Sequence, residues 1–233
     1  MMSQFLISDM LLPVWVSIKL ASITTLCLLL FATPLAYWLA KPSRGNVAGR
    51  IKILLMGIIA MPLVLPPTVI GFYLLLLLSP SVGIGQWLIE HNISPLVFTF
   101  EGLVIGSIIY SLPFYIQPVY AQFLRIPQSV MEVASLLEPS RLRRFIKIVL
   151  PQARIGIILG GLISFAHTIG EFGVVLMIGG SISGETKVVS IAIYEQVEAL
   201  NYEAAHLMSG ILIIMGVIMV ALIAAVSRLN QRP

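Results

Sequence analysis

Charged residues are scarce in this sequence. Lys, Arg, Asp and Glu make up 10% of its 233 residues, whereas 58% are hydrophobic. A soluble domain carries about 25% charged residues, so the composition excludes an ordinary soluble fold and places the chain in a lipid bilayer. Because helices satisfy their own backbone hydrogen bonds in lipid, we expect one all-α domain over residues 1–233, a polytopic bundle of membrane helices.

Cysteine and phosphate-binding motifs are also lacking. With Cys27 as the single cysteine, the chain cannot form an internal disulfide or a cysteine-based metal site. The sequence contains no GxxxxGK[ST] loop, which is the motif that cradles the phosphates of ATP. We therefore expect no enzymatic activity, no metal and no cofactor on this chain.

Five apolar segments are long enough to cross a bilayer, which takes about 20 residues. They lie at residues 14–40, 51–78, 102–124, 153–178 and 206–227. An odd number of crossings puts the two termini on opposite sides of the membrane.

Basic residues indicate which side is cytoplasmic, because short loops rich in Lys and Arg stay there. They gather around the first and third connections and after the last span: Lys41, Arg44, Arg50, Lys52, Arg125, Arg141, Arg143, Arg144, Lys147, Arg154, Arg228 and Arg232. This distribution predicts an N-terminus outside and a C-terminus in the cytoplasm. It also accounts for the net charge of +4 without a nucleic-acid partner.

A short amphipathic helix is predicted at the outer surface, within residues 188–200. Apolar side chains recur there at near-helical spacing between glutamates: Val189, Ala192, Ile193, Val197 and Leu200. Two roles stay open for it, a cap over the bundle and a docking element for a partner.

The cytoplasmic loop at residues 125–152 reads as two short amphipathic helices. Val130, Ala134 and Leu137 share one helical face, and a second apolar stripe follows Pro139. Pro139 disfavours helical dihedrals at Glu138, so we expect a bend at residues 137–139. The pattern fits a plug for a groove on a soluble protein or a helical pair folded under its own bundle.

Two membrane segments carry residues that lipid does not tolerate. In MPLVLPPTVIG, Pro62, Pro66 and Pro67 each remove a backbone donor, so the break must face protein or a water-lined pathway; a plain kink is the alternative. In HTIGEFG, His167 precedes Glu171 by one helical turn, and the two side chains would share a face. Acidic residues inside a membrane point to function.

The cytoplasmic loop resembles the signature of ABC importer permeases, in which EAA is followed after three residues by Gly and after nine more by Ile-x-Leu-Pro. The matching positions are Glu132, Ala134, Ile148, Leu150 and Pro151, with Leu137 and Glu138 at the bend and Glu138 in place of the Gly. The resemblance implies that this loop is a coupling loop seated in a cleft of an ATPase subunit.

The segments PLVLPPTVIG, GEFG and GET resemble the molybdate permeases among the oxyanion importers, over about residues 15–228. The resemblance implies a bacterial plasma-membrane permease for molybdate or a similar oxyanion such as tungstate, with sulfate or thiosulfate as the alternative cargo. It implies a pathway or gate formed by Pro62, Pro66, Pro67, Thr68, Gly71, His167, Thr168, Gly170, Glu171 and Gly173. Those permeases usually carry Arg where this chain has His167, and they often carry a basic residue where it has Gln117.

The same resemblance implies partners: a second copy of this chain, two cytoplasmic ATPase subunits that hold ATP and Mg, and an outside binding protein that delivers the oxyanion. For Glu171 we favour a structural or gating role, since a fixed anion repels an anionic cargo; a proton relay is the alternative. Two other classes stay open, an ion-coupled secondary transporter and a metalloenzyme with His167 and Glu171 as two of its ligands.

Overall fold

The computed structural model describes residues 2–42 and 45–229, with side chains from residue 10 onward. Two of the residues predicted to be cytoplasmic, Arg44 and Arg232, lie outside this described part. Every regular element within it is a helix, which confirms the all-α prediction. Five of the described helices, counting short breaks as continuous, are long and apolar enough to cross a membrane, and one bent helix pair would make a sixth crossing.

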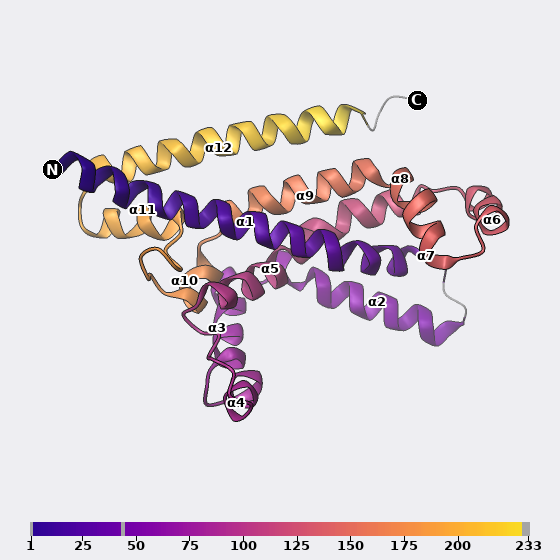
Figure 1. Cartoon of the computed structure of the whole chain (residues 1–233), viewed down its shortest axis with the longest axis horizontal. Coiled ribbons are helices and arrows are strands. Elements are labelled where there is room, and N and C mark those ends of the chain that lie inside the picture. Colours follow the sequence, from indigo (N-terminus) through magenta and orange to yellow (C-terminus); the bar gives the residue numbers. More distant parts are fainter. Residues whose placement is uncertain (1, 43–44, 230–233) are drawn as a thin grey trace.

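The long helices of the bundle run along the long axis of the molecule (Figure 1). They are α1 (Met2–Ala40), α2 (Asn46–Ala60), α5 (Phe100–Leu124), α9 (Arg154–Ile169) and α12 (Tyr202–Leu229). Helices α1, α5 and α9 enclose an apolar core that includes Leu28, Ala32, Tyr115 and Val119. The face of α12 is largely uncovered, as expected of a helix that meets lipid.

Small residues let α9 lie directly against α5. A Cβ atom at Gly156 would lie 2.6 Å from Cβ of Gln122, and one at Gly160 would lie 2.9 Å from the carbonyl oxygen of Tyr115. Both distances are far below van der Waals contact. Glycine at these two positions therefore sets the distance between the two helices.

The predicted span 51–78 is not one helix. It consists of α2, a 3-10 turn η1 (Met61–Leu63) and α3 (Pro67–Leu78). Pro66 precedes α3 with extended dihedrals, φ −55° and ψ 139°, because the ring of Pro67 disfavours helical dihedrals at the residue before it. Helix α3 then leaves the bundle together with α4 (Gly83–Glu90), as Figure 1 shows.

The predicted span 153–178 is also divided. Helix α9 ends at Ile169, residues 170–172 form a break, and α10 (Gly173–Gly179) follows. By contrast α5 continues through both of its prolines, Pro113 and Pro118. A proline pattern alone therefore does not separate a broken span from a continuous one.

The predicted amphipathic helix at the outer end is α11 (Val189–Glu198). Its side chains Val189, Ile191 and Ala192 are buried, whereas Val197 is 43% exposed and Leu200, beyond the helix end, is 72% exposed. The helix packs between α1 and α12, so its first half covers the bundle and its second half is open.

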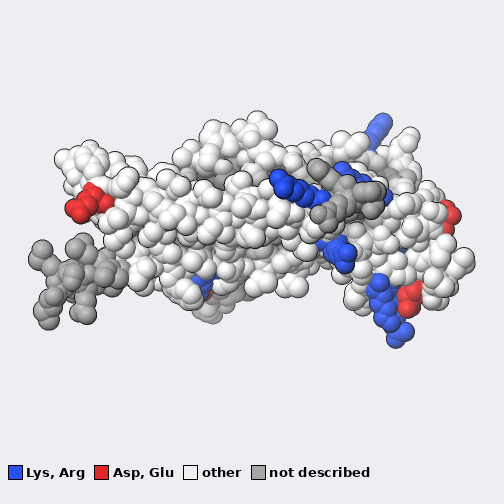
Figure 2. Space-filling model, turned by 90° about the horizontal axis from the view of Figure 1, so that it is seen from above, with Lys and Arg blue, Asp and Glu red and all other residues white. Residues whose placement is uncertain are grey.

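Charge is distributed unevenly along the molecule. On the face shown in Figure 2, most Lys and Arg side chains gather at the end that carries α6 (Gln128–Leu137) and α7 (Arg141–Arg144) in Figure 1. The opposite end holds the start of α1. This arrangement has the polarity that the basic-residue pattern predicts.

Candidate functional site: a helical bend and a pocket at a broken span

The segment between α5 and α9 is a bent pair of short helices. Helix α6 ends at Leu137, and Glu138 has extended dihedrals, φ −134° and ψ 95°. Ser140 then caps α7 by accepting a hydrogen bond from the N–H of Arg143. The bend therefore lies where Pro139 predicted it. Because φ at Glu138 is negative, this position does not require glycine.

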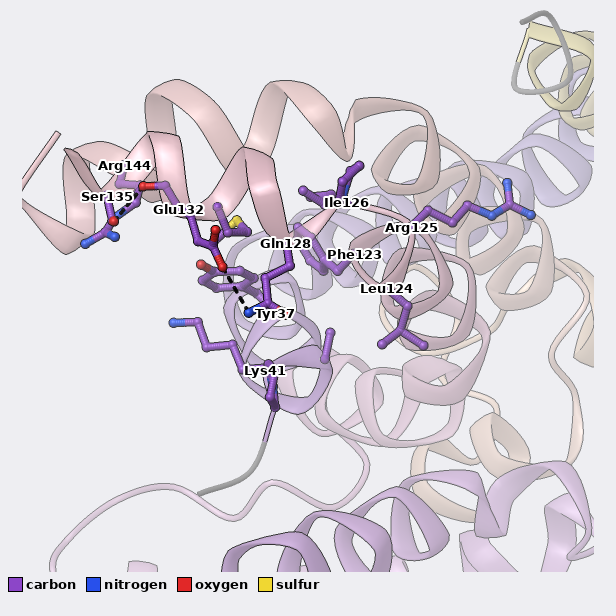
Figure 3. Close-up of a pocket in the computed structure, with 14 residues that line it drawn as sticks. Tyr37, Lys41, Phe123, Leu124, Arg125, Ile126, Gln128, Glu132, Ser135 and Arg144 are labelled. Carbon is purple, nitrogen blue, oxygen red and sulfur yellow. Dashed lines mark hydrogen bonds between the residues drawn. The ribbon is translucent and has the colours of Figure 1, made fainter. Parts of the chain in front are cut away.

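Helix α6 has one face against the bundle and one face free. Ala134 is buried, whereas Val133, Leu136 and Leu137 are 53%, 82% and 75% exposed. The pattern predicted that Ala134 and Leu137 share one face of the helix, but the structure buries Ala134 and exposes Leu137. Glu132 stays at the surface, and its Oε1 accepts a hydrogen bond of 3.2 Å from Nε2 of Gln128 (Figure 3).

The second half of the segment joins the bundle. A π-helical turn (Phe145–Val149) leads into α8 (Leu150–Gln152), and the whole arm meets α9 at an angle of 75°. Val149 is fully buried in the main core, flanked by the half-buried Ile148 and Leu150, and Pro151 is exposed. The structure therefore places Ile148, Leu150 and Pro151 at a junction, apart from the free face of α6.

A pocket of about 500 Å³ lies where the two broken spans meet. Its walls come from the start of α3, from α5 and from the break between α9 and α10: Pro67, Thr68, Tyr110, Ala166, His167, Gly170, Glu171, Phe172 and Gly173. Six of these residues were predicted for the pathway or gate. Of the other predicted residues, Pro62 and Pro66 shape the break in the second span, whereas Gly71 and Thr168 are buried outside the pocket wall.

Glu171 is the buried carboxyl at the break. Its side chain is 4% exposed, and Oγ of Ser107 on α5 donates a hydrogen bond of 2.9 Å to its Oε2. The other oxygen, Oε1, has no hydrogen-bond partner among the described residues. Oγ of Ser190 on α11 donates to the backbone carbonyl of Glu171 at 2.6 Å. The break is therefore tied to two different helices.

His167 has partners of its own. Its Nδ1 lies 2.9 Å from Oγ of Ser111, and its ring stacks on Phe114 with centroids 3.8 Å apart. Within the described residues, the only ion pair joins two other side chains, so His167 and Glu171 do not form the pair that their spacing predicted. Each uses a different serine of α5.

The serines of α5 were not identified from the sequence. Ser107 and Ser111 are four residues apart and both are fully buried, so they lie on one face of the helix. That spacing of hydroxyls inside an apolar span is the signal that would have identified them. The pocket residues Tyr110, Ala166 and Phe172 were also missed, although Phe172 lies within the GEFG segment.

Glycines allow α3 and α10 to touch. A Cβ at Gly173 would lie 2.7 Å from Cβ of Pro67 and 3.3 Å from the backbone nitrogen of Thr68, and one at Gly71 would lie 2.8 Å from Cβ of Met177. This is a close contact between the two segments that interrupt the spans. A displacement of one segment must therefore move the other.

The described residues contain no group of three or more His, Cys, Asp or Glu side chains that could hold a metal ion. His167 and Glu171 thus stand without the third protein ligand that catalytic zinc ordinarily uses.

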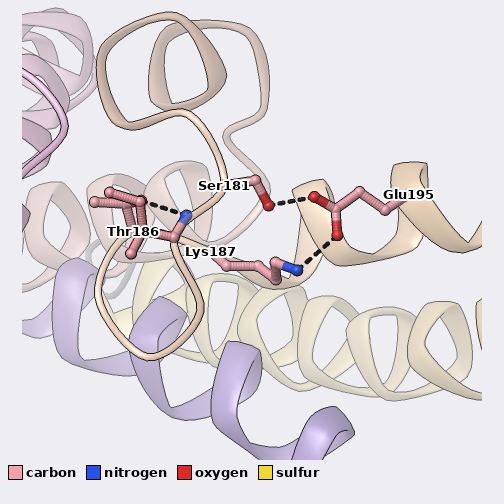
Figure 4. A network of polar contacts seen from close by, with 5 residues as sticks. Ser181, Thr186, Lys187 and Glu195 are labelled. Atoms are coloured by element: carbon pink, nitrogen blue, oxygen red, sulfur yellow. Dashed lines mark hydrogen bonds and ion pairs between the residues drawn. The ribbon is translucent and has the colours of Figure 1, made fainter.

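A compact loop connects α10 and α11. Oγ1 of Thr186 donates a hydrogen bond of 2.6 Å to the carbonyl of Gly179. Nζ of Lys187 lies 2.7 Å from Oε2 of Glu195, and Oγ of Ser181 donates to the other carboxylate oxygen, Oε1 (Figure 4). Burial raises the pKa of Glu195, but the hydrogen bonds from Lys187 and Ser181 and the charge of Lys187 outweigh it and hold that pKa below its ordinary value.

The chain was compared with known proteins. The model of a family described as "Binding-protein-dependent transport system inner membrane component" matches residues 32–232. The chain is similar to the molybdenum transport system permease protein ModB of Azotobacter vinelandii, with 46% identity over 83% of this chain and 84% of that protein. It is also similar to the sulfate transport system permease protein CysW of Escherichia coli K12, with 34% identity over 76% of this chain and 59% of CysW.

Solved structures share the fold. One is the inward-facing MetNI methionine ABC transporter, with a TM-score of 0.71, 14% identity, and coverage of 97% of this chain and 98% of that one. Another is a bacterial alginate ABC transporter in complex with an alginate-bound periplasmic protein, with a TM-score of 0.66, 18% identity, and coverage of 94% and 79%.

Proposed function

Because the chain belongs to the family of inner membrane components of binding-protein-dependent transport systems, we propose that it is the permease subunit of an ATP-driven importer of molybdate or tungstate. The similarity to ModB over most of both chains supports this choice of cargo. The subunit carries out transport, and the hydrolysis of ATP with Mg belongs to a partner.

The observation that carries the mechanism is the bent segment with its free leucines. Leu136 and Leu137 extend from α6 into solvent, at the end of the molecule where basic side chains gather (Figure 2). A short helix with an exposed apolar face fits a groove on a soluble protein. That soluble protein would be the ATPase subunit. Two ATPase subunits would bind two copies of this chain, one at each α6.

The junction at residues 148–151 connects this docking helix to the transport pathway. Val149 and Ala153 are fully buried in the core formed by α1, α5 and α9, so a force on α6 would reach α9 through packed side chains. Helix α9 ends at the pocket, and Gly173, the first residue after the break at 170–172, lies against Pro67 at the start of α3. Closure of the ATPase subunits would thereby move the two breaks together.

The pocket itself suits a gate better than a binding site for the anion. Its titratable side chains are Tyr110, His167 and Glu171, and it contains no Lys or Arg that would offer a permanent positive charge. Weak binding along the path is what conduction requires. Selection of the oxyanion would then rest with the outside binding protein that delivers it.

The orientation follows from the same polarity. The end with α6 and α7 would face the cytoplasm, which puts the N-terminus outside and the C-terminus inside a bacterial plasma membrane. Helix α11 and the loop closed by Lys187 and Glu195 would then face the binding protein.

Transport into vesicles tests the proposal. Purified permease is reconstituted with its ATPase and binding protein, and uptake of labelled molybdate and sulfate is measured with ATP and without it. We expect ATP-dependent uptake of molybdate that exceeds uptake of sulfate. A preference for sulfate would favour the second candidate, a sulfate permease, which the similarity to CysW supports. Uptake driven by an ion gradient alone would contradict the proposal.

A further inference from the structure

A second pocket lies beneath α6, away from the broken spans. It has a volume of about 650 Å³ and opens between the end of α1, the end of α5 and the start of α6. Its wall combines the apolar residues Phe123, Ile126 and Met131 with the polar side chains Tyr37, Lys41, Arg125, Gln128, Glu132, Ser135 and Arg144. Figure 3 shows Lys41 and Arg144 on one side of this pocket, whereas Arg125 points to the opposite side.

The positive charge in this pocket is not neutralised by the protein. Among the described residues the only ion pair is between Lys187 and Glu195, so no carboxylate lies within salt-bridge distance of Lys41 or Arg144. Burial lowers the pKa of Lys41, and the charges of Arg141, Arg144 and Lys52 lower it further. Several cations therefore repel one another around a cavity, and an anion bound there would relieve the repulsion.

Glu132 is the one acid on the pocket wall. Its Oε1 is held by Nε2 of Gln128 at 3.2 Å, and it does not pair with either cation. The single carboxylate of Glu132 faces the cations Lys41 and Arg144, and Arg141 and Lys52 add positive charge around Lys41. The net charge of this region is therefore positive.

The pocket lies at the ends of two helices that are long and apolar enough to cross a membrane. Lys41 directly follows the last residue of α1, and Arg125 directly follows the last residue of α5. Trp38, one turn earlier on α1, is 43% exposed, and Nζ of Lys52 lies 5.1 Å from the centre of its ring. Exposed tryptophan beside lysine at the end of a span is typical of the membrane interface.

We propose that this pocket binds a phosphate-type tetrahedral anion, carried by the headgroup of an anionic phospholipid. Lys41 and Arg144 would donate to the phosphate oxygens, since charge-assisted bonds of this kind are the strong ones. The apolar wall of Phe123, Ile126 and Met131 would contact the glycerol and the first methylenes of the acyl chains. This proposal rests on the geometry of the pocket and not on the identity of the transported cargo.

A bound headgroup would also hold α6 in place. Gln128, Met131, Glu132 and Ser135 of α6 form one wall of the pocket, and the ends of α1 and α5 form the other. An occupant that contacts both walls stabilises the position of α6 relative to the spans.

Lipid retention tests this site. The full chain is purified from membranes that contain phosphatidylglycerol and phosphatidylcholine, and bound lipids are measured by native mass spectrometry. We expect retained phosphatidylglycerol in the wild type and about fivefold weaker retention for each of Lys41→Gln and Arg144→Gln. Arg143→Gln is the matched control, since Arg143 is an exposed cation of α7 that does not line the pocket, and this variant should retain the lipid. Lys41→Arg keeps the charge and should also retain it.

Two further outcomes decide the assignment. Equal retention in the wild type and the Lys41→Gln/Arg144→Gln double variant, with both proteins eluting as folded species, would overturn the site. Phosphate or molybdate is added separately to protein in phosphatidylcholine alone. Binding there that depends on Lys41 and Arg144 would overturn the lipid assignment and give the same pocket to a soluble oxyanion.

Discussion

Adding one methyl group at Gly173 should disrupt the contact between the two broken spans. In the structure, a Cβ at this position would lie 2.7 Å from Cβ of Pro67 and 3.3 Å from the backbone nitrogen of Thr68. Carbon atoms in contact are separated by about 3.5–4.0 Å. Because a proline ring and a backbone atom cannot rotate away, Gly173→Ala must push α3 away from α10 by roughly 1 Å.

The cost of that displacement can be bounded. Overpacking a close contact destabilises a protein by about 1–3 kcal/mol. For a chain of this size each kcal/mol lowers Tm by about 2–4 °C. We expect the Gly173→Ala permease to unfold several degrees below the wild type and to transport more slowly, because the gate segments no longer meet correctly.

Gly170→Ala is a matched control in the same pocket. A Cβ there would meet nothing closer than 3.8 Å, the distance to the carbonyl oxygens of Ala166 and His167, so a methyl group fits. The assay is ATP-dependent uptake in vesicles, combined with thermal unfolding of the purified complex. If Gly173→Ala and Gly170→Ala gave the same uptake and the same Tm, the reasoning that this contact positions the gate would be refuted.

Four further predictions concern other parts of the molecule. Leu136→Glu should abolish co-purification of the ATPase without loss of membrane insertion, since this side chain is 82% exposed. Leu229→Glu, at an exposed leucine of α12, should leave the complex intact. A stable complex in both variants would contradict docking through α6. Ser107→Ala removes the hydrogen-bond donor to Oε2 of Glu171 and should lower the free energy of unfolding by about 1–3 kcal/mol. Ser81→Ala, at an exposed serine, should change that free energy little. Equal unfolding curves for the two variants would show that this hydrogen bond does not stabilise the break between α9 and α10. His167→Arg should preserve or increase oxyanion uptake, because Arg also stacks on aromatic rings such as Phe114 and adds a permanent charge; loss of uptake in a folded protein would count against contact with the cargo. The pKa of Glu195 in the folded protein lies below its ordinary value of 4.5, so the stabilisation of the loop by this carboxylate should be present above pH 4.5 and lost as the pH falls through the lowered pKa. Protease cleavage of residues 180–187, measured against pH, checks this. A cleavage profile identical to that of Glu195→Gln would contradict it.

Features set by local stereochemistry were predictable from the sequence. Pro139 alone indicates the bend after Leu137, and the structure has α6 ending there. The double proline at 66 and 67 likewise predicted the interruption of the second span, which the dihedrals of Pro66 confirm. In both cases a missing N–H and a steric restriction act within a few residues.

Features set by long-range contacts were not predictable. Glu171 bonds to Ser107 and Ser190, which lie 64 and 19 residues away in the sequence. Spacing alone suggested His167 as its partner, but helix α9 ends at Ile169, so the geometry of a continuous helix does not apply to Glu171. Similarly, α5 remains continuous through Pro113 and Pro118 because tertiary packing, and not proline count, decides where a span breaks.

The exposed face of α6 was also only partly predictable from the sequence. Helical periodicity placed Ala134 and Leu137 together, and the structure buries the first and exposes the second. The apolar pattern identified the helix, but it could not divide the apolar residues between the bundle and a partner.

Contact between α6 and an ATPase in intact cells tests the central claim most directly. A photo-crosslinking amino acid is placed at Leu136, which is 82% exposed, and at Leu200, which follows the end of α11 and is 72% exposed. We expect irradiation to join position 136, and not position 200, to a cytoplasmic ATP-hydrolysing subunit. A crosslink from position 136 to a periplasmic protein, or to no ATPase in cells that transport molybdate, would contradict the account.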